Sequence, residues 1–419
     1  MTLPPTVPAD RTPGPIDFRA EAVVIQSDLV ALRRDLHRHP ELGNDLPRTQ
    51  AAVLRALDGL PLDIHTGTSL SSVVAVLRGT APTYGEERPT VLLRGDMDAL
   101  PIREETGLEF ASTNDTMHAC GHDMHTAGLV GAATLLSRHV DEIAGDVVFM
   151  FQPGEEGPGG AEPMIGEGLL SVAGKRPDAA YALHVLSSEA AGSWSTRPGT
   201  VMAGSMSLTV TVRGRGGHGS MPHASIDPVP VAAEIVLALQ SYATRRVNVF
   251  DPVVITVGQI IAGTAPNVIP DTATLRASVR VLSSDSIEQL GRDLPLLAEG
   301  ISNAHGCTAE TQLHLDLPVT VNDLAETAFV LDELARLHGE DAVAVRENPR
   351  LGSEDFSFVL QQVPGAFVFL GAHPLPVAAV PPTNHSSKAI FDEGVLAEQA
   401  ATLAHLAYRR ITAPPAMAK

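Results

Sequence analysis

"TVLLRGD", residues 90–96, is a run of mostly aliphatic residues that ends in an arginine, a glycine and an aspartate. Similar apolar runs recur along the chain, as "SSVVAVLRG" at 71–79, "GDVVFMFQP" at 145–153, "AAYALHV" at 179–185 and "AFVFLGA" at 366–372. Longer stretches with helical spacing lie between them, such as "MHTAGLVGAATLLSRHV" at 124–140. Continuous apolar strands that alternate with helices predict an α/β domain, in which helices flank a mostly parallel mixed sheet that is buried on both faces.

The pattern changes near residue 205. "SMSLTVTVRGRG" at 205–216 alternates apolar and polar residues, which is typical of a strand with one exposed face. Further alternating strands are predicted within 251–283 and at 308–317, and helices at 227–246 and near 286–304. This β-α-β-β-α-β order predicts a two-layer α+β module of ferredoxin-like type, inserted at 205–316 into a larger domain formed by residues 21–204 and 317–419.

Length and composition limit the organisation of the chain. With 419 residues, of which 44% are hydrophobic, it exceeds what one core usually organises, so two domains are expected. Residues 1–20 are rich in proline and contain no apolar segment of signal-peptide length, which predicts a disordered tail and no export signal. Cys120 and Cys307 are too far apart for a disulfide framework, which favours a reducing compartment and a cytoplasmic location.

The charge balance argues against some classes of partner. The chain has 49 acidic and 29 basic residues, a formal net charge of -20. Attraction to nucleic acid or to anionic lipid is therefore not expected. No uninterrupted apolar run is long enough to span a bilayer, so the sequence predicts no membrane partner either.

Ionisable side chains follow several of the predicted buried strands. They are Asp96 and Asp98, Glu155 and Glu156, and His184. In open α/β sheets, ligands bind at the carboxyl ends of the strands. Cys120 and His122 stand just before a helix that Asp123 could cap. One edge of the sheet is thus expected to gather carboxylates, imidazoles and a thiol.

A metal ion would resolve the electrostatic conflict that this edge creates. Burying Glu155 and Glu156 as bare anions is costly, because like charges at short range oppose joint ionisation unless a cation neutralises them. One glutamate could bind the ion, while the other takes a proton from a water that the ion acidifies. Thiolate and imidazole are common ligands of zinc and similar ions, so Cys120 is predicted to be a ligand.

Each of these residues also has an ordinary structural explanation. A single histidine is more often a surface or core residue than a ligand, and Cys120 alone could be a small buried hydrophobe. A pair of glutamates is usually solvated. It is their conjunction at strand ends that favours a metal centre. We expect the side chain of Cys307 to lie in a hydrophobic core and that of His314 to lie on the exposed face of a strand.

Nine motifs in order resemble a known family. They are "HPELG" (39–43), "RGDMDALP" (94–101), "HACGHDMHTA" (118–127), "FQPGEEG" (151–157), "ALHV" (182–185), "GGHGSMPH" (216–223), "GTAPNVIPD" (263–271), "SEDFSF" (353–358) and "NHS" (384–386). Together they resemble the peptidase M20 amidohydrolases, within the branch of hippurate hydrolases, auxin-conjugate hydrolases and related N-acyl-amino-acid amidohydrolases. The resemblance runs from about residue 30 to residue 410.

The resemblance implies a catalytic domain with two divalent metal ions per subunit, Zn²⁺ or Mn²⁺, with Co²⁺ and Ni²⁺ also acceptable. The implied ligands are Cys120, His122, Glu156, His184 and His385. Glu155 becomes the general base and later the acid, and Asp98 lies near it. Other members have a metal-binding histidine where this chain has Asp96, so the metal shell is expected to be rebuilt around Cys120 and His122.

The inserted domain is implied to mediate a homodimer and to contribute to the site. His218 and Asn267 match positions that reach into the active site in related enzymes, the histidine from the partner subunit, where it can stabilise an oxyanion. His218 could instead be a simple turn residue. Arg280 is a candidate for binding a substrate carboxylate, or for a surface ion pair. "LGSEDFSF", residues 351–358, is expected to form a loop and a short helix over the pocket.

The implied reaction is hydrolysis of the amide bond of a small N-acyl or N-aroyl amino acid, which yields a carboxylic acid and an amino acid. Three alternatives remain open. The enzyme could be an aminopeptidase or dipeptidase that acts on free amino termini. Cys120 could be a nucleophile with a histidine base. The chain could also be a binding protein that keeps the fold without turnover.

Overall fold

The computed structural model of the protein describes residues 16–83, 88–377 and 379–412, and the chain divides into two compact units. The first comprises Met1–Trp194, Asp332–Val343 and Val368–Lys419, and the second comprises Ser195–Leu331 and Ala344–Phe367. Residues 1–15 of the predicted tail lie outside the described residues. The first described helix begins at Phe18, where the side chain of Asp17 caps it.

One sheet has eight strands, in the order β1-β2-β4-β3-β5-β16-β6-β15. The strands are β1 (Leu62–Thr66), β2 (Val73–Arg78), β3 (Thr90–Asp96), β4 (Asp146–Gln152), β5 (Ala179–Ala190), β6 (Trp194–Thr196), β15 (Val343–Val345) and β16 (Gly365–His373). β3 runs parallel to both β4 and β5, whereas β1 and β2 form an antiparallel edge. Every residue of β3 and β4 is buried. The predicted α/β class with a mixed, mostly parallel sheet is confirmed.

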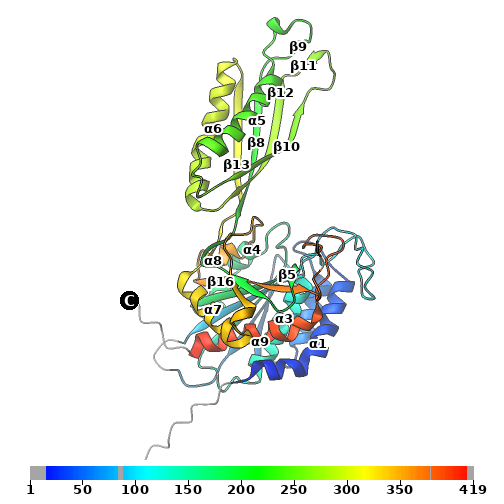
Figure 1. Cartoon of the computed structure of the whole chain (residues 1–419), viewed down its shortest axis with the longest axis vertical. Helices are drawn as coiled ribbons and strands as arrows, with labels where there is room; N and C mark the ends of the chain where they lie inside the picture. The colour runs from blue at the N-terminus through cyan, green and yellow to red at the C-terminus, as the bar shows by residue number, and fades with distance from the viewer. Residues whose placement is uncertain (1–15, 84–87, 378, 413–419) are drawn as a thin grey trace, which may run out of the picture. The chain divides into compact units, whose positions relative to one another are not determined.

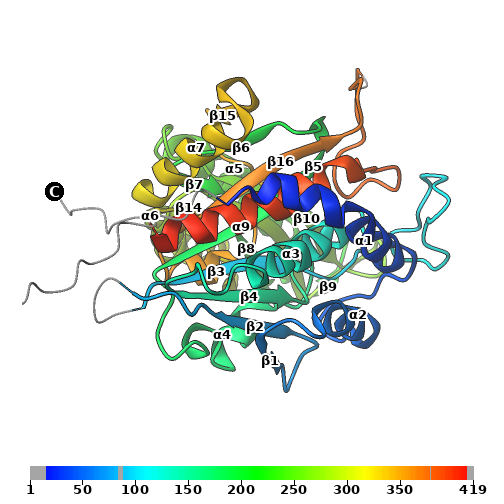
Figure 2. The same ribbon diagram turned by 90° about the horizontal axis from the view of Figure 1, so that it is seen from below.

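Helices pack over one face of this sheet (Figures 1 and 2). Here α1 (Phe18–Arg38), α3 (His122–Ser137) and α9 (Leu396–Thr412) contact one another, and α2 (Pro47–Leu57) packs beside α3. α3 is buried along almost its whole length, because it lies between β3 and α9. Its N-terminal turn is thereby fixed close to the carboxyl end of β3. A short helix, α4 (Ala161–Gly166), follows β4.

The second unit contains a four-stranded antiparallel sheet with the order β10-β12-β8-β13. Its elements are β8 (Gly204–Arg213), α5 (Pro228–Arg245), β10 (Val254–Ala262), β12 (Thr272–Val281), α6 (Ser284–Ala304) and β13 (Thr308–Leu317). Alternate residues of β8 enter one core with residues of α5 and α6, so the helices cover one face of the sheet. Cys307 belongs to this core, and His314 has a side chain that is 80% exposed, as the sequence predicts for both.

Short elements complete the described chain. β7 (Gly199–Met202) pairs with β14 (Thr320–Asn322), and β9 (Gly217–His218) pairs with β11 (Val268–Ile269). Two further helices are α7 (Leu324–His338) and α8 (Ser357–Leu360). Within residues 16–83, 88–377 and 379–412, no helix is long and apolar enough to cross a membrane.

Candidate metal centre

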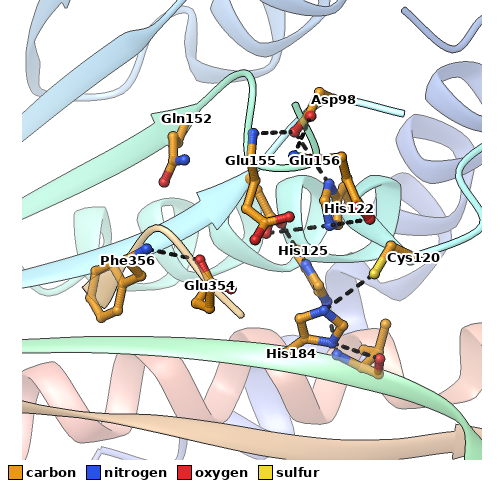
Figure 3. A network of polar contacts seen from close by, with 12 residues as sticks. Asp98, Cys120, His122, His125, Gln152, Glu155, Glu156, His184, Glu354 and Phe356 are labelled. Atoms are coloured by element: carbon orange, nitrogen blue, oxygen red, sulfur yellow. Dashed lines mark hydrogen bonds and ion pairs between the residues drawn. The ribbon is translucent and has the colours of Figure 1, made fainter. Parts of the chain in front are cut away.

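Three neighbouring strands bring the polar residues of the first unit to one place. β3 ends at Asp96, which lies beside Gln152 at the end of β4 in the parallel ladder. The loop after β4 carries Glu155 and Glu156, and β5 carries His184. Figure 3 shows Glu155 of this loop and His184 of β5 directed toward Cys120 and His122, which lie just before and at the start of α3. The strand order therefore explains why residues distant in the sequence share one site.

All five candidate ligands lie close together. Sγ of Cys120 is 3.4 Å from Nε2 of His184, and Oε1 of Glu156 is 2.9 Å from Nε2 of His385 and 3.9 Å from Nε2 of His122. Three sets are formed only by these candidates and Glu155, with ligand atoms within 4.8 Å of one another: Cys120, His122 and His184; Cys120, Glu156 and His385; and His122 with Glu155 and Glu156. The sets overlap through Cys120, His122 and Glu156, which suits two neighbouring ions.

The histidines direct ring nitrogen atoms into this space. Nδ1 of His184 donates to the carbonyl oxygen of Val185 at 2.8 Å, which leaves the lone pair of Nε2 facing Cys120. Nδ1 of His122 lies 3.3 Å from Oδ1 of Asp98. Among the described residues, neither ring nitrogen of His122 nor Oε1 of Glu156 makes a hydrogen bond of good geometry, although all three atoms are buried. Buried polar atoms without such bonds are typical of a site that binds an ion.

The electrostatics of the cluster favour a cation. Burial and the nearby Glu156 carboxylate raise the pKa of the Cys120 thiol above its ordinary value. Polar contacts with Cys120 and with the Glu156 carboxylate, whose Oε1 is 2.9 Å from Nε2 of His385, raise the pKa of His385 to about 10. The surroundings of His385 therefore attract positive charge strongly. A thiolate, imidazoles and carboxylates form the donor set that zinc and other divalent first-row ions prefer, so these residues fit such ions.

Asp98 holds the loop that carries the two glutamates. Its Oδ1 accepts the backbone N–H of Glu155 at 3.0 Å, and its Oδ2 accepts that of Glu156 at 2.9 Å (Figure 3). Since Oδ1 is also close to Nδ1 of His122, one carboxylate orients both the loop and a candidate ligand. The predicted place of Asp98 near Glu155 thus has a definite geometry.

Both carboxylate oxygens of Asp96 contact other side chains of the protein. Its Oδ1 lies 2.6 Å from Nδ1 of His125, and its Oδ2 accepts from Arg94 at 2.5 Å. Burial opposes its ionisation, yet Arg94 and the neighbouring histidines hold the pKa of Asp96 well below its usual range. Nε2 of His125 accepts the N–H of Val185 at 2.8 Å. Both nitrogens of His125 are therefore engaged, and we assign His125 and Asp96 to the supporting framework.

The sequence-based prediction that Asp123 caps α3 is wrong. The cap position belongs to Gly121, so Asp123 lies inside the first turn and faces the protein interior. Its Oδ2 lies 2.7 Å from both Nε of Arg33 and Nδ1 of His37, and all three side chains are buried. Against the effect of burial, Arg33 and His37 keep the pKa of Asp123 well below its ordinary value. The turn that carries His122 is anchored to α1 in this way.

The other predicted site residues belong to the second unit. His218 in β9 faces Val268 of β11 in the antiparallel ladder, and the N–H of Gly219 donates to the carbonyl oxygen of Asn267 at 2.8 Å. His218 and Asn267 therefore lie on neighbouring segments that a small two-stranded antiparallel sheet brings together. Arg280 lies in β12, and its guanidinium donates to Oγ of Ser353 at 2.6 Å. The roles assigned to these three residues stay predictions.

The segment "LGSEDFSF" also belongs to the second unit. Its last two residues begin the short helix α8, so a loop followed by a short helix is observed. The N–H of Phe356 donates to Oε1 of Glu354 at 2.9 Å within this loop (Figure 3). That the segment covers a pocket stays a prediction.

A substitution at Gly154 tests whether metal binding depends on the conformation of the loop that carries Glu155 and Glu156. The φ of Gly154 is +76°, and a Cβ at this position would meet Oδ1 of Asn44 at 1.9 Å. We expect Gly154→Ala to displace Glu155 and Glu156 and to weaken zinc binding by at least about 10-fold, because misplaced supporting groups cost that much in metal affinity. Isothermal titration calorimetry of the apoprotein would measure this.

Gly157→Ala is the matched control, because Gly157 has nothing within 4 Å of its Cβ position and does not have a positive φ. Equal zinc affinity in both variants would contradict the proposed rigidity of the loop.

Comparisons with known proteins agree with this site. Residues 92–409 match peptidase family M20/M25/M40. Thermostable carboxypeptidase 1 of Saccharolobus solfataricus is 37% identical over 89% of this chain and 92% of its own length. An N-acetyldiaminopimelate deacetylase of a Geobacillus species is 36% identical over 82% of this chain and 89% of its own length. A Bacillus subtilis structure described as a dinuclear metal-binding peptidase of the M20 family has a TM-score of 0.79 at 30% identity, covering 92% of this chain and 98% of that one. The chain belongs to peptidase family M20/M25/M40.

Proposed function

We propose that the protein is a metal-dependent amidohydrolase that cleaves the amide bond of N-acyl amino acids and releases a carboxylic acid and a free amino acid. The observation that carries the proposal is the convergence of Cys120, His122, Glu156, His184 and His385. Buried atoms of His122 and Glu156 make no hydrogen bond of good geometry there, and Glu155 lies beside them. Structural stability alone would not favour such an arrangement, because unpaired buried polar groups cost free energy.

Two divalent ions are proposed to bind among these residues. Cys120 lies in both ligand sets that contain a thiol, one with His122 and His184 and one with Glu156 and His385. Cys120 would therefore contribute to both positions. When bound, such ions polarise a carbonyl group and lower the pKa of a water molecule.

Glu155 is proposed to move the proton. Its carboxylate belongs to the set with His122 and Glu156, while Asp98 fixes its backbone. Glu156 lies 2.9 Å from His385 and is proposed as the ligand of the pair, and Glu155 is proposed as the glutamate that acts on water. It takes a proton from the attacking water and returns this proton to the leaving amide nitrogen, which must be protonated to depart as an amine.

The relatives support the choice of substrate class. One is named a carboxypeptidase and the other an N-acetyldiaminopimelate deacetylase, and both names describe cleavage of an acyl group from the nitrogen of an amino acid. We infer that the substrate of this chain is likewise a small molecule with an acylated nitrogen and a free carboxylate. Arg280 is proposed to bind that carboxylate, and His218 and Asn267 to contact the substrate carbonyl.

The inserted region 205–316 is proposed to mediate a homodimer. β10 is an edge strand, and its Val254, Ile260 and Ile261 are exposed by 43%, 54% and 54%. An exposed apolar edge strand readily pairs with a second chain. The partner subunit would then be the source of the histidine that reaches the site in related enzymes.

Replacing Glu155 tests the mechanism. Glu155→Gln keeps the size of the side chain but removes its basicity, so we expect turnover of N-acetyl amino acids to fall about 100- to 10,000-fold, the usual contribution of a general base. Metal content measured by mass spectrometry is expected to stay unchanged. Glu162→Gln, at an exposed glutamate in α4, is the control and should retain full activity. A Glu155→Gln enzyme with unchanged turnover would exclude the proposed role.

A comparison of substrates and of metal removal tests the reaction class. We expect hydrolysis of N-acetyl and N-benzoyl amino acids, much weaker hydrolysis of dipeptides with a free amino terminus, and loss of activity with a chelator that added Zn²⁺ or Mn²⁺ reverses. Preference for the free amino terminus would instead indicate an aminopeptidase or dipeptidase. Activity that survives complete metal removal would indicate a Cys120 nucleophile.

A charge placed on β10 tests the dimer. Ile260→Lys should shift the sedimentation coefficient from that of a dimer to that of a monomer, because a charged edge strand resists pairing. Val24→Lys, at a position in α1 that is 73% exposed, is the control. If both variants sediment like the wild type, β10 does not form the interface.

A further inference from the structure

We propose that Asn384 is a positioning residue that fixes three ligand-bearing segments of the metal centre through one side-chain amide. The inference rests on the proposed function, since it concerns the ions proposed above. Asn384 directly precedes His385, and its side chain contacts the segments of Cys120 and His184. One residue therefore joins three stretches of chain that are widely separated in the sequence.

The amide nitrogen of Asn384 makes the contacts that face the site. Nδ2 donates to the carbonyl oxygen of Cys120 at 3.1 Å and to the carbonyl oxygen of Val185 at 3.0 Å. The same oxygen of Val185 accepts Nδ1–H of His184 at 2.8 Å. Asn384 thus shares an acceptor with His184 and helps to hold the imidazole with Nε2 toward the site.

The amide oxygen of Asn384 anchors the side chain on the opposite side. Oδ1 accepts the backbone N–H of Ser187 at 3.0 Å and lies 3.1 Å from Oγ of the same serine. These partners fix the orientation of the amide, because a backbone N–H can only donate and the two backbone carbonyls can only accept. Exchange of Oδ1 and Nδ2 would break all three backbone contacts.

His385 depends on this anchor because its own backbone is unusual. It is the one described non-glycine residue with a positive φ, at +70°. Such a conformation persists only where the surroundings enforce it. The N–H of His385 donates to the carbonyl oxygen of Ala119 at 2.9 Å, so the ligand is held next to Cys120 through its backbone and through the Asn384 side chain.

The amide of Asn384 also faces the sulfur. Nδ2 lies 3.7 Å from Sγ of Cys120, within reach of a weak N–H···S contact. A donor beside a thiolate stabilises its negative charge, whereas an oxygen in the same place would oppose it. Asn384 is therefore expected to affect the metal-bound state of Cys120 in addition to the position of the chain.

Asn384→Asp is the decisive substitution, because it keeps the shape of the side chain and replaces the donor with an anionic oxygen. The new oxygen would face two carbonyl oxygens and the sulfur. We expect the Kd for Zn²⁺, measured by competition with a chromophoric chelator, to rise about 10- to 100-fold, as is usual when a group that orients metal ligands is lost. In Co²⁺-loaded protein, the thiolate-to-cobalt absorption band should weaken or shift.

Asn322→Asp is a closely matched control. Nδ2 of Asn322 donates to two backbone carbonyls, those of Arg197 and Phe367, and its Oδ1 accepts the N–H of Phe367. It lies in the second unit, so its replacement should lower the melting temperature but leave the Kd for Zn²⁺ and the cobalt band unchanged. Equal metal affinity and equal spectra for wild type and Asn384→Asp would overturn the proposal.

Two further outcomes are distinguishable. If the wild type binds no divalent ion, the proposed function fails, whatever the variants do.

If Asn384→Asp does not fold, Ser187→Ala takes its place, because it removes only the serine hydroxyl from Oδ1 of Asn384. A rise of a few-fold in the Kd for Zn²⁺, without change in circular dichroism, would support the proposal, and an unchanged Kd would refute it.

Discussion

A charged group that is buried away from water is stable only if an opposite charge lies beside it inside the protein. By this criterion the acidic groups near the end of β3 form two classes. Asp96 and Asp123 are paired with the buried arginines Arg94 and Arg33. Glu156 has only histidine ion-pair partners among the described residues, and Cys120 faces His184. The first class needs no further cation and shapes the framework. The second is the class that divalent ions would neutralise.

Hydrogen bonds to the backbone of a single residue, Val185, connect the framework with the candidate ligands. The N–H of Val185 donates to His125, which is tied to Asp96, while its carbonyl oxygen accepts from both His184 and Asn384. β3, α3, β5 and the segment around residue 384 therefore meet at one point. A site in which several ligands share supporting contacts can stay ordered before an ion arrives, which reduces the entropy cost of binding.

Sequence reasoning predicted that many of these side chains would lie together, because the signal for them is local. Apolar strands that end in acidic residues predicted where Glu156 would lie, and the α/β class followed from the same strands. His125 and Asn384 were missed, since their roles depend on partners from distant segments and leave no periodic pattern. Asp123 was misassigned because the helix starts at His122, one residue before it. A signal was available in Arg94, since a charged residue within a buried strand requires a buried partner.

The account depends on ions among the thiol, imidazoles and carboxylates, and anomalous X-ray scattering at the zinc edge from crystals of the zinc-loaded protein tests it most directly. It predicts two peaks, with Sγ of Cys120 at about 2.3 Å from zinc and a carboxylate oxygen of Glu156 at about 2.0 to 2.2 Å from zinc. A map with no peak in this cluster, or with zinc bound only elsewhere, would contradict it.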